Sequence, residues 1–313
     1  MSEKIKYLCL FLSIIFVIYM ALILVSSYEH YILEKEIDDI FHSEIYPKST
    51  SDIDVIIQKM ANVQDPELKL QLLSKWIQDD FIFSLNNKSF SRDDYIYYIL
   101  TNNNKNYYIS NPEGRRVIRA GKFSNNPYCI AYYRAGACGE YATLAQHVAM
   151  LSGLNARKVS DPSGYHGWVE VEINGTWYFY DPTYPLNPRS NSWFGLRSEN
   201  TNNSVIRNSA QVFYKDEDIT HYYPPTGKLI VNGLSTNDLI ELSWMHNNGI
   251  HKFQFIPQNE TYTLTLRPRE YTIEVQRFWF LFSDKQQINI TEGFEREIKI
   301  SPSFFRLDFT LFG

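Results

Sequence analysis

The stretch HGWVEVEINGTWYFYDPT, residues 166–183, has the pattern of two β-strands joined by a tight turn. Apolar and polar residues alternate in WVEVEI, and TWYFY is rich in the aromatic residues that favour strands. The dipeptide Asn174-Gly175 between these runs is the strongest short-range signal for a two-residue hairpin turn. With this dipeptide at the centre of the turn, Ile173 pairs with Thr176, and the register of both strands is fixed.

That register predicts a contact between two polar side chains. Trp168 lies opposite Asp181, so His166, two residues earlier on the same face, becomes a diagonal neighbour of the carboxylate. Diagonal positions on a ribbon are about 7–8 Å apart at the backbone, within reach of long side chains. A histidine–carboxylate pair is therefore expected from local geometry. The alternatives are a histidine in a surface turn and an aspartate that serves only the turn before Pro182.

The preceding segment AGACGEYATLAQHVAMLSG, residues 135–153, predicts a compact buried helix that begins at a cysteine. After Gly139 no glycine or proline interrupts the run until Gly153, which stands where helices usually end. The N-terminus of a helix stabilises an anion, so Cys138 is placed where a thiolate is favoured. The alternative is a buried structural thiol, because free cysteine is among the most buried residue types.

Cys138, His166 and Asp181 are together the residue types of thiol catalysis, and we predict them as the catalytic set. A thiolate attacks a carbonyl carbon, an imidazole takes the thiol proton and later protonates the leaving amine, and a carboxylate fixes the imidazole tautomer. Trp168 and Tyr165 flank His166 and are the candidate substrate-binding residues. We expect Trp168 to pack in the sheet near the site, and contact with substrate is the alternative.

These motifs resemble the transglutaminase-like superfamily. The resemblance rests on Cys138 at the start of a buried helix, on His166-Gly167-Trp168 at the opening of a strand, and on Asp181-Pro182-Thr183 after the next strand. It implies an α+β fold with a papain-like core, in which the helix bearing the cysteine packs on an antiparallel sheet. It also implies a thioester acyl-enzyme formed from a peptide or protein amide, which an amine or water then resolves.

The N-terminus predicts a transmembrane anchor. Residues 7–28 contain no charged residue, and as a helix rising about 1.5 Å per residue they can span a hydrocarbon core of roughly 30 Å. A cleaved signal peptide is the alternative, although its apolar region is typically only about 7–15 residues long. Lys4 and Lys6 before the run and Glu29 after it favour a cytoplasmic N-terminus and an extracytoplasmic catalytic domain.

Three parts are expected along the chain. Residues 1–28 form a cytoplasmic stub and anchor, residues 29–223 the catalytic domain, and residues 224–313 an all-β sandwich, with the boundary at Pro224-Pro225. Short β-prone runs separated by turn residues are typical of a sandwich. The run YTLTLRPREYTIEVQ, residues 262–276, resembles the prealbumin-like sandwiches of carboxypeptidase regulatory domains.

Net charge and residue spacing argue against nucleic-acid binding and against a metal site. A net charge of −5 and the lack of a dense Lys/Arg patch give no footprint for a nucleic-acid partner. No residues stand at metal-ligand spacing, so neither metal nor cofactor is expected. Three rival functions remain. They are a thiol peptidase or amidase limited to hydrolysis, a non-catalytic surface adhesion or assembly protein that keeps the triad, and a structural ectodomain in which the triad is a coincidence. In an oxidising space, a Cys129–Cys138 disulfide would switch the enzyme off.

Overall fold

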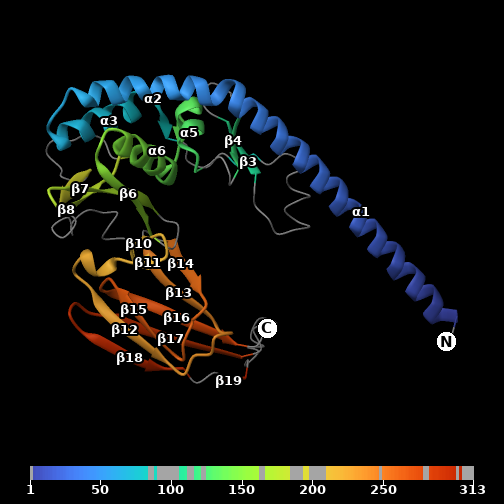
Figure 1. Ribbon diagram of the computed structural model, residues 1–313. Helices are drawn as coiled ribbons and strands as arrows, with labels where there is room; N and C mark the ends of the chain where they lie inside the picture. The colour runs from blue at the N-terminus through green and yellow to red at the C-terminus, as the bar shows by residue number, and fades with distance from the viewer. Residues whose placement is uncertain are drawn as a thin grey trace. The chain divides into compact units, whose positions relative to one another are not determined.

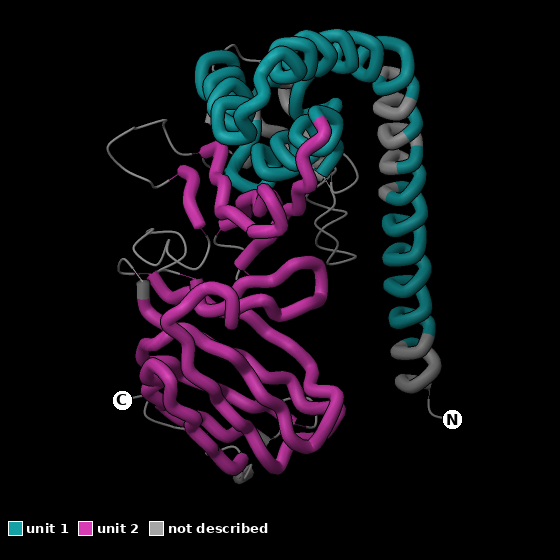
Figure 2. Tube along the Cα trace, turned by 60° about the vertical axis from the view of Figure 1, so that its left-hand side comes forward, with its two compact units in different colours: residues 1–152 teal, residues 153–313 magenta. Residues whose placement is uncertain are grey.

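The chain folds into helices and mostly antiparallel sheets in the computed structural model (Figure 1), so the α+β class expected from the sequence is confirmed. The structure describes residues 3–83, 88–89, 106–110, 116–120, 125–161, 166–183, 193–196, 209–246, 249–277, 282–300 and 303–304. Two compact units divide the chain, residues 1–152 and residues 153–313 (Figure 2). The domain bounds expected from the sequence, 29–223 and 224–313, stay a prediction.

The first unit is built mainly of helices. These are α1 (Glu3–Ile40), the π-helical turn η1 (Phe41–Ile45), α2 (Tyr46–Ala61), α3 (Pro66–Asp80), α5 (Pro127–Tyr133) and α6 (Cys138–Leu151). Short strands complete it: β1 (Ile82–Phe83) pairs in parallel with β5 (Ala135–Gly136), and β2 (Lys88–Ser89), β3 (Asn106–Ser110) and β4 (Arg116–Ala120) form a small sheet. Helices α2, α3 and α6 contact one another. Each contributes fully buried apolar side chains, Met60, Leu73 and Leu144 among them, to the core of this unit.

Helix α1 carries the apolar run of the N-terminus and is 38 residues long. The consecutive residues Phe16, Val17 and Ile18 are all more than half exposed, so apolar side chains point outward on several sides of the helix. In the parts of the chain that the structure describes, no helix is both long and apolar enough to cross a membrane. The anchor expected at residues 7–28 stays a prediction.

The second unit begins with a six-stranded antiparallel sheet in the order β11-β10-β6-β7-β8-β9. Its strands are β6 (Asn155–Ser160), β7 (Gly167–Ile173), β8 (Thr176–Tyr180), β9 (Phe194–Leu196), β10 (Phe213–Tyr214) and β11 (Glu217–Asp218). The 3-10 turn η3 (Thr220–Tyr222) follows. Side chains from β6, β7 and β8 gather around Trp168 in a buried cluster on this sheet.

The hairpin β7–β8 has the register that the sequence predicts. Ile173 pairs with Thr176, and the pairing runs outward to Val169 and Tyr180. Asn174-Gly175 forms the turn with φ values of 51° and 78°. Positive φ at both central residues is what a type I′ turn requires, and Asn and Gly tolerate it best.

The rest of the second unit is a β-sandwich. One sheet has the order β15-β12-β18 and the other the order β14-β13-β16-β17-β19. The strands are β12 (Gly227–Asn232), β13 (Leu239–His246), β14 (Gly249–Phe255), β15 (Thr261–Leu266), β16 (Arg269–Arg277), β17 (Phe282–Ile290), β18 (Glu295–Lys299) and β19 (Ser303–Phe304). Both sheets contribute to one buried apolar cluster, so the all-β sandwich expected here is present.

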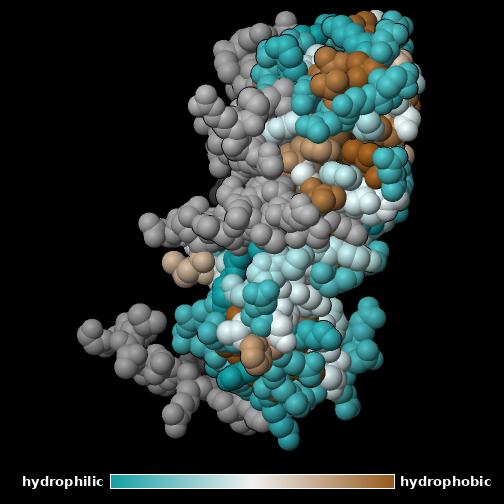
Figure 3. Space-filling model, turned by 90° about the vertical axis from the view of Figure 1, so that its left-hand side faces the viewer, coloured by the Kyte–Doolittle hydropathy of each residue, from teal (hydrophilic) through white to brown (hydrophobic). Residues whose placement is uncertain are grey.

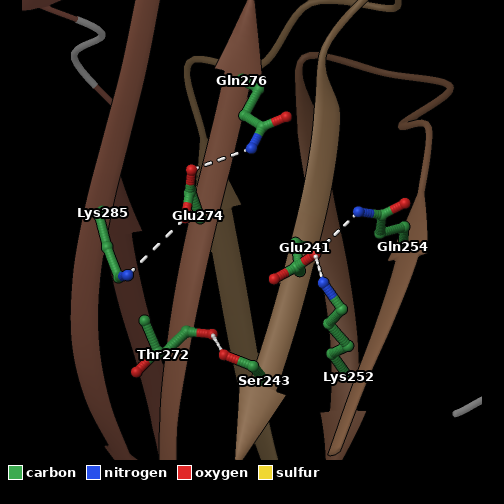
Figure 4. A network of polar contacts seen from close by, with 8 residues as sticks. All are labelled: Glu241, Ser243, Lys252, Gln254, Thr272, Glu274, Gln276 and Lys285. Carbon is green, nitrogen blue, oxygen red and sulfur yellow. Dashed lines mark hydrogen bonds and ion pairs between the residues drawn. The ribbon is translucent and has the colours of Figure 1, made fainter. Parts of the chain in front are cut away.

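The outer face of the larger sheet carries polar side chains that satisfy one another. Glu241 accepts hydrogen bonds from Lys252 at 3.0 Å and from Gln254 at 2.8 Å, and Glu274 lies 3.8 Å from Lys285 (Figure 4). The visible surface of the sandwich is mostly hydrophilic in Figure 3. Successive side chains of a strand point to opposite faces of the sheet, so these polar residues face solvent while their apolar neighbours along the same strands face the core.

Candidate active site

His166 and Asp181 form the central pair of the candidate site. His166 immediately precedes β7 and Asp181 immediately follows β8, so the hairpin sets them side by side. The Nε2 atom of His166 lies 2.5 Å from Oδ2 of Asp181. The side chain of Asp181 is fully buried and that of His166 is 12% exposed. A buried carboxylate in this position orients the ring and stabilises an imidazolium. Because Nε2 faces Asp181, Nδ1 is the ring nitrogen that can exchange a proton with another group.

The second oxygen of the Asp181 carboxylate is held by Thr183. Oδ1 accepts hydrogen bonds from the Thr183 backbone N–H at 2.9 Å and from its hydroxyl at 2.6 Å. The Asp181 backbone N–H in turn donates to the carbonyl of Trp193 at 2.7 Å. Both carboxylate oxygens therefore have partners, and the Asp-Pro-Thr motif builds a turn that fixes the carboxylate toward His166.

Trp168 packs inside the sheet, the role that the sequence left open beside substrate contact. It is fully buried. Its ring lies nearly parallel to that of His166, with centroids 6.3 Å apart and planes 21° apart. Its indole N–H donates to the hydroxyl of Tyr223 at 3.2 Å. Tyr165, the other residue predicted to line the substrate site, lies outside the described residues.

Cys138 is the first residue of α6 in the first unit. It is partly exposed. The loop before it is held by Glu140, whose carboxylate accepts a hydrogen bond from the Ala137 N–H at 3.0 Å. A Cβ at Gly136 would lie 2.8 Å from Cβ of Glu140, so only glycine fits there. The thiol thus stands at a fixed helix N-terminus, where backbone N–H groups lack intrahelical acceptors and favour an anion.

The other described cysteine has a different environment. Cys129 is buried within α5, and burial raises the pKa of its thiol to about 12. A thiol of this kind stays protonated at neutral pH and is a poor nucleophile. Neither Cys129 nor Cys138 is in a disulfide. The inactivating Cys129–Cys138 disulfide considered for an oxidising space is therefore not formed in this structure. Within the described ranges, no three His, Cys, Asp or Glu side chains gather closely enough to hold a metal ion.

Comparison with known proteins identifies the part of the chain that carries this site. Residues 105–182 match the family model of the transglutaminase-like superfamily. This part of the chain is transglutaminase-like. The matched core contains Cys138, His166 and Asp181, and the resemblance drawn from their motifs is confirmed. No match was found among curated proteins.

A solved structure described as the crystal structure of a TGase is also similar to this chain. The likeness covers 52% of this chain and 39% of that one, with 12% sequence identity and a TM-score of 0.30. The chain therefore spans well under half the length of that protein.

Sequence reasoning gave no role to three residues that support the transglutaminase-like core. Thr183 belongs to the quoted Asp-Pro-Thr motif, and a Thr two residues after an Asp is a known turn signal. Glu170 is a fully buried carboxylate on β7, and Tyr223 donates to it at 2.5 Å. The contact between these two joins residues far apart in the sequence, so no local pattern indicates it.

Proposed function

We propose that the protein is a thiol acyl-transfer enzyme that acts on peptide or protein amides through an acyl-enzyme at Cys138. The main support is the 2.5 Å pairing of His166 with the buried carboxylate of Asp181. The same transglutaminase-like segment also places Cys138 at the first position of a helix. These are a nucleophile, a base and a group that orients the base, the three roles that covalent acyl transfer needs.

The proposed reaction has two steps. His166 takes the proton of the Cys138 thiol, and the sulfur attacks the amide carbonyl carbon to form a tetrahedral intermediate. The imidazolium then gives that proton to the departing amine, and the C–N bond breaks to leave a thioester. A primary amine or water attacks the thioester carbonyl, His166 takes the incoming proton, and the thiol is restored. The backbone N–H of Cys138 is proposed as one donor to the oxyanion.

Asp181 contributes electrostatically without taking a proton. It is buried, and both its oxygens already accept hydrogen bonds or face the ring. A fixed carboxylate beside the ring lowers the free energy of the imidazolium that forms in both steps. Since the same set serves an amine or water as the acceptor, a thiol peptidase or amidase limited to hydrolysis is the second proposal.

Mass spectrometry of the full-length protein tests this chemistry. The protein is incubated with a set of peptide amides, with and without a labelled primary amine. A mass shift located on Cys138 and lost on mild hydroxylamine treatment supports a thioester. Labelled peptide then supports transfer, and free acid alone supports hydrolysis. The absence of any acyl adduct in wild type and in a His166→Ala control, across the set, favours the non-catalytic adhesion or assembly protein.

We also propose that residues 7–28 anchor the chain in a membrane, with the N-terminus cytoplasmic and the catalytic part outside. The uncharged run lies within one helix, α1, and apolar side chains such as Phe16 and Val17 are more than 60% exposed. Such a surface is stable when lipid covers it. Retention in the membrane fraction after alkaline carbonate supports this proposal. Release by carbonate, or protection of the catalytic part from protease added outside intact cells, contradicts it.

A further inference from the structure

Behind the ring of His166 lies a chain of buried side chains joined by hydrogen bonds, and the proposed reaction gives these side chains no role. Trp168 lies nearly parallel to His166, and its indole N–H donates to the Tyr223 hydroxyl at 3.2 Å. The same hydroxyl donates to Oε1 of Glu170 at 2.5 Å. The Tyr223 hydroxyl thus fixes both Trp168 and Glu170, which point to the same face of β7 (Gly167–Ile173) as His166.

Glu170 is held on its other side as well. Its Oε2 lies 2.5 Å from Nε of Arg157, and the guanidinium stands over the rings of Trp177 at 4.3 Å and Tyr214 at 4.7 Å. The carboxylate is fully buried and the Arg157 side chain is 15% exposed. Because a buried charge is costly unless it is paired and hydrogen-bonded, these contacts resist displacement of Tyr223 from Glu170.

Tyr223 is tied to the β-sandwich through its backbone. Nη1 of Arg267 donates to the Tyr223 carbonyl at 2.8 Å, and the Arg267 backbone N–H donates to the carbonyl of Ala210 at 3.1 Å. Nearby, Nη2 of Arg269 donates to the Ser209 carbonyl at 3.2 Å. The turn between β15 and β16, together with Arg269 at the start of β16, therefore holds both ends of the segment from residue 209 to residue 223.

Arg267 is an unusual residue for such a place, because it is only 3% exposed. Burial, together with the charge of Arg269, lowers the pKa of Arg267 to about 10, so the side chain stays cationic at neutral pH. Within the described residues its Nε has no hydrogen-bond partner. A buried arginine costs stability compared with an apolar side chain of similar volume, and its hydrogen bond to the Tyr223 carbonyl offsets part of that cost.

We infer that Arg267 of the sandwich is a positioning residue for His166, acting through Tyr223 and Trp168. The sandwich is then a part of the site's framework rather than a separate spacer. The inference rests on the proposed function only in giving His166 the role of the base. It predicts that the geometry of the His166–Asp181 contact depends on a residue of the sandwich that touches neither side chain.

Proton NMR of the full-length protein in detergent micelles tests this inference. The proton between His166 Nε2 and Asp181 should give a resonance far downfield, since the two atoms are 2.5 Å apart. A His166→Gln variant assigns it. In Arg267→Met and in Tyr223→Phe we expect this resonance to move upfield or to broaden. In the double variant the resonance should move no further than in Tyr223→Phe alone, because the effects of residues that act through the same contacts are not additive.

A matched control comes from β16, the strand that follows Arg267. Arg277 lies at the far end of β16 and pairs with the buried carboxylate of Asp238 at 2.6 Å. Arg277→Met should lower the melting temperature and leave the resonance in place. If Arg267→Met does not fold, Tyr223→Phe keeps the test, since it removes one hydroxyl only. An unchanged resonance in folded Tyr223→Phe or Arg267→Met overturns the inference. A moved resonance in a protein whose Cys138 shows no activated reactivity keeps the inference and rejects the proposed function.

Discussion

Thr183 closes back on Asp181, donating two hydrogen bonds to the one carboxylate oxygen that does not face His166. The aspartate is fully buried, so without these bonds its charge would lack compensation on that side. Thr183 therefore helps to orient the His166 imidazole indirectly, because it fixes the carboxylate that contacts the ring. The hydroxyl of Thr183 is as much a part of the site's geometry as the hairpin that brings the pair together.

Thr183→Val should weaken the site while keeping the shape of the side chain. The change removes a hydrogen bond to a charged, buried acceptor, which is worth about 1.5–3 kcal/mol. We expect the free energy of unfolding to fall by about that amount, and the alkylation rate of Cys138 at neutral pH to fall with it. Urea unfolding and iodoacetamide kinetics measure the two effects. Thr183→Ser keeps the hydroxyl and serves as the control; equal losses in both variants would contradict the role of the hydroxyl.

Cys129 should make the protein less stable at alkaline pH. Burial raises the pKa of its thiol to about 12, so the folded state holds the proton that the unfolded state loses. Its contribution to stability is complete below the ordinary thiol pKa of about 8.5 and is lost as pH rises toward about 12. Within that window the free energy of unfolding should fall by up to about 1.4 kcal/mol per pH unit. Cys129→Ala should show a shallower alkaline slope in urea titrations, and an identical slope would show that this thiol does not contribute.

Gly175 is needed for its backbone conformation alone. Its φ is 78°, and a Cβ added there would meet nothing within 4 Å. Gly175→Ala should therefore cost about 1–2 kcal/mol from the left-handed conformation, with no steric clash. Thr176→Ala, the next residue and an exposed one, is the control and should cost less. Chemical denaturation of both variants measures the difference, and a neutral Gly175→Ala would count against the type I′ turn.

Glu170→Gln should be among the most destabilising substitutions in the second unit. It leaves the Arg157 guanidinium without its carboxylate and weakens the bond from Tyr223. Removing one partner of a buried pair costs about 3–5 kcal/mol. Glu172→Gln, on the same strand but opposite Asn155 at the surface, should cost far less. Thermal unfolding compares the two, and similar melting temperatures would show that the buried network is weak.

The local parts of this architecture could be predicted from the sequence. The turn residues Asn174-Gly175 fix the register of the hairpin, and that register alone brings His166 to Asp181. Likewise, Cys138 begins a helix because small residues precede it and an uninterrupted run follows. In both cases the signal lies within a few residues of the feature that it determines.

The supporting network could not be predicted in the same way. Alternation in WVEVEI suggests one polar face, but Trp168, Val169, Glu170 and Val171 are all fully buried, because both faces of β7 are covered. On the face of Trp168 and Glu170, part of this cover comes from Tyr223, which is distant in sequence. A side chain's partner at such a separation depends on the topology of the whole unit, which no periodicity records.

The alkylation rate of Cys138 as a function of pH, in the full-length protein and in its His166→Ala variant, tests the central claim most directly. An ordinary thiol with a pKa near 8.5 is only about 1% thiolate at pH 6.5. We predict that Cys138 reacts at pH 6.5 roughly tenfold or more faster than such a thiol, that His166→Ala abolishes this advantage, and that Cys129→Ser leaves it intact. Equal, ordinary reactivity of Cys138 in wild type and His166→Ala would contradict an activated nucleophile and favour a binding or structural role.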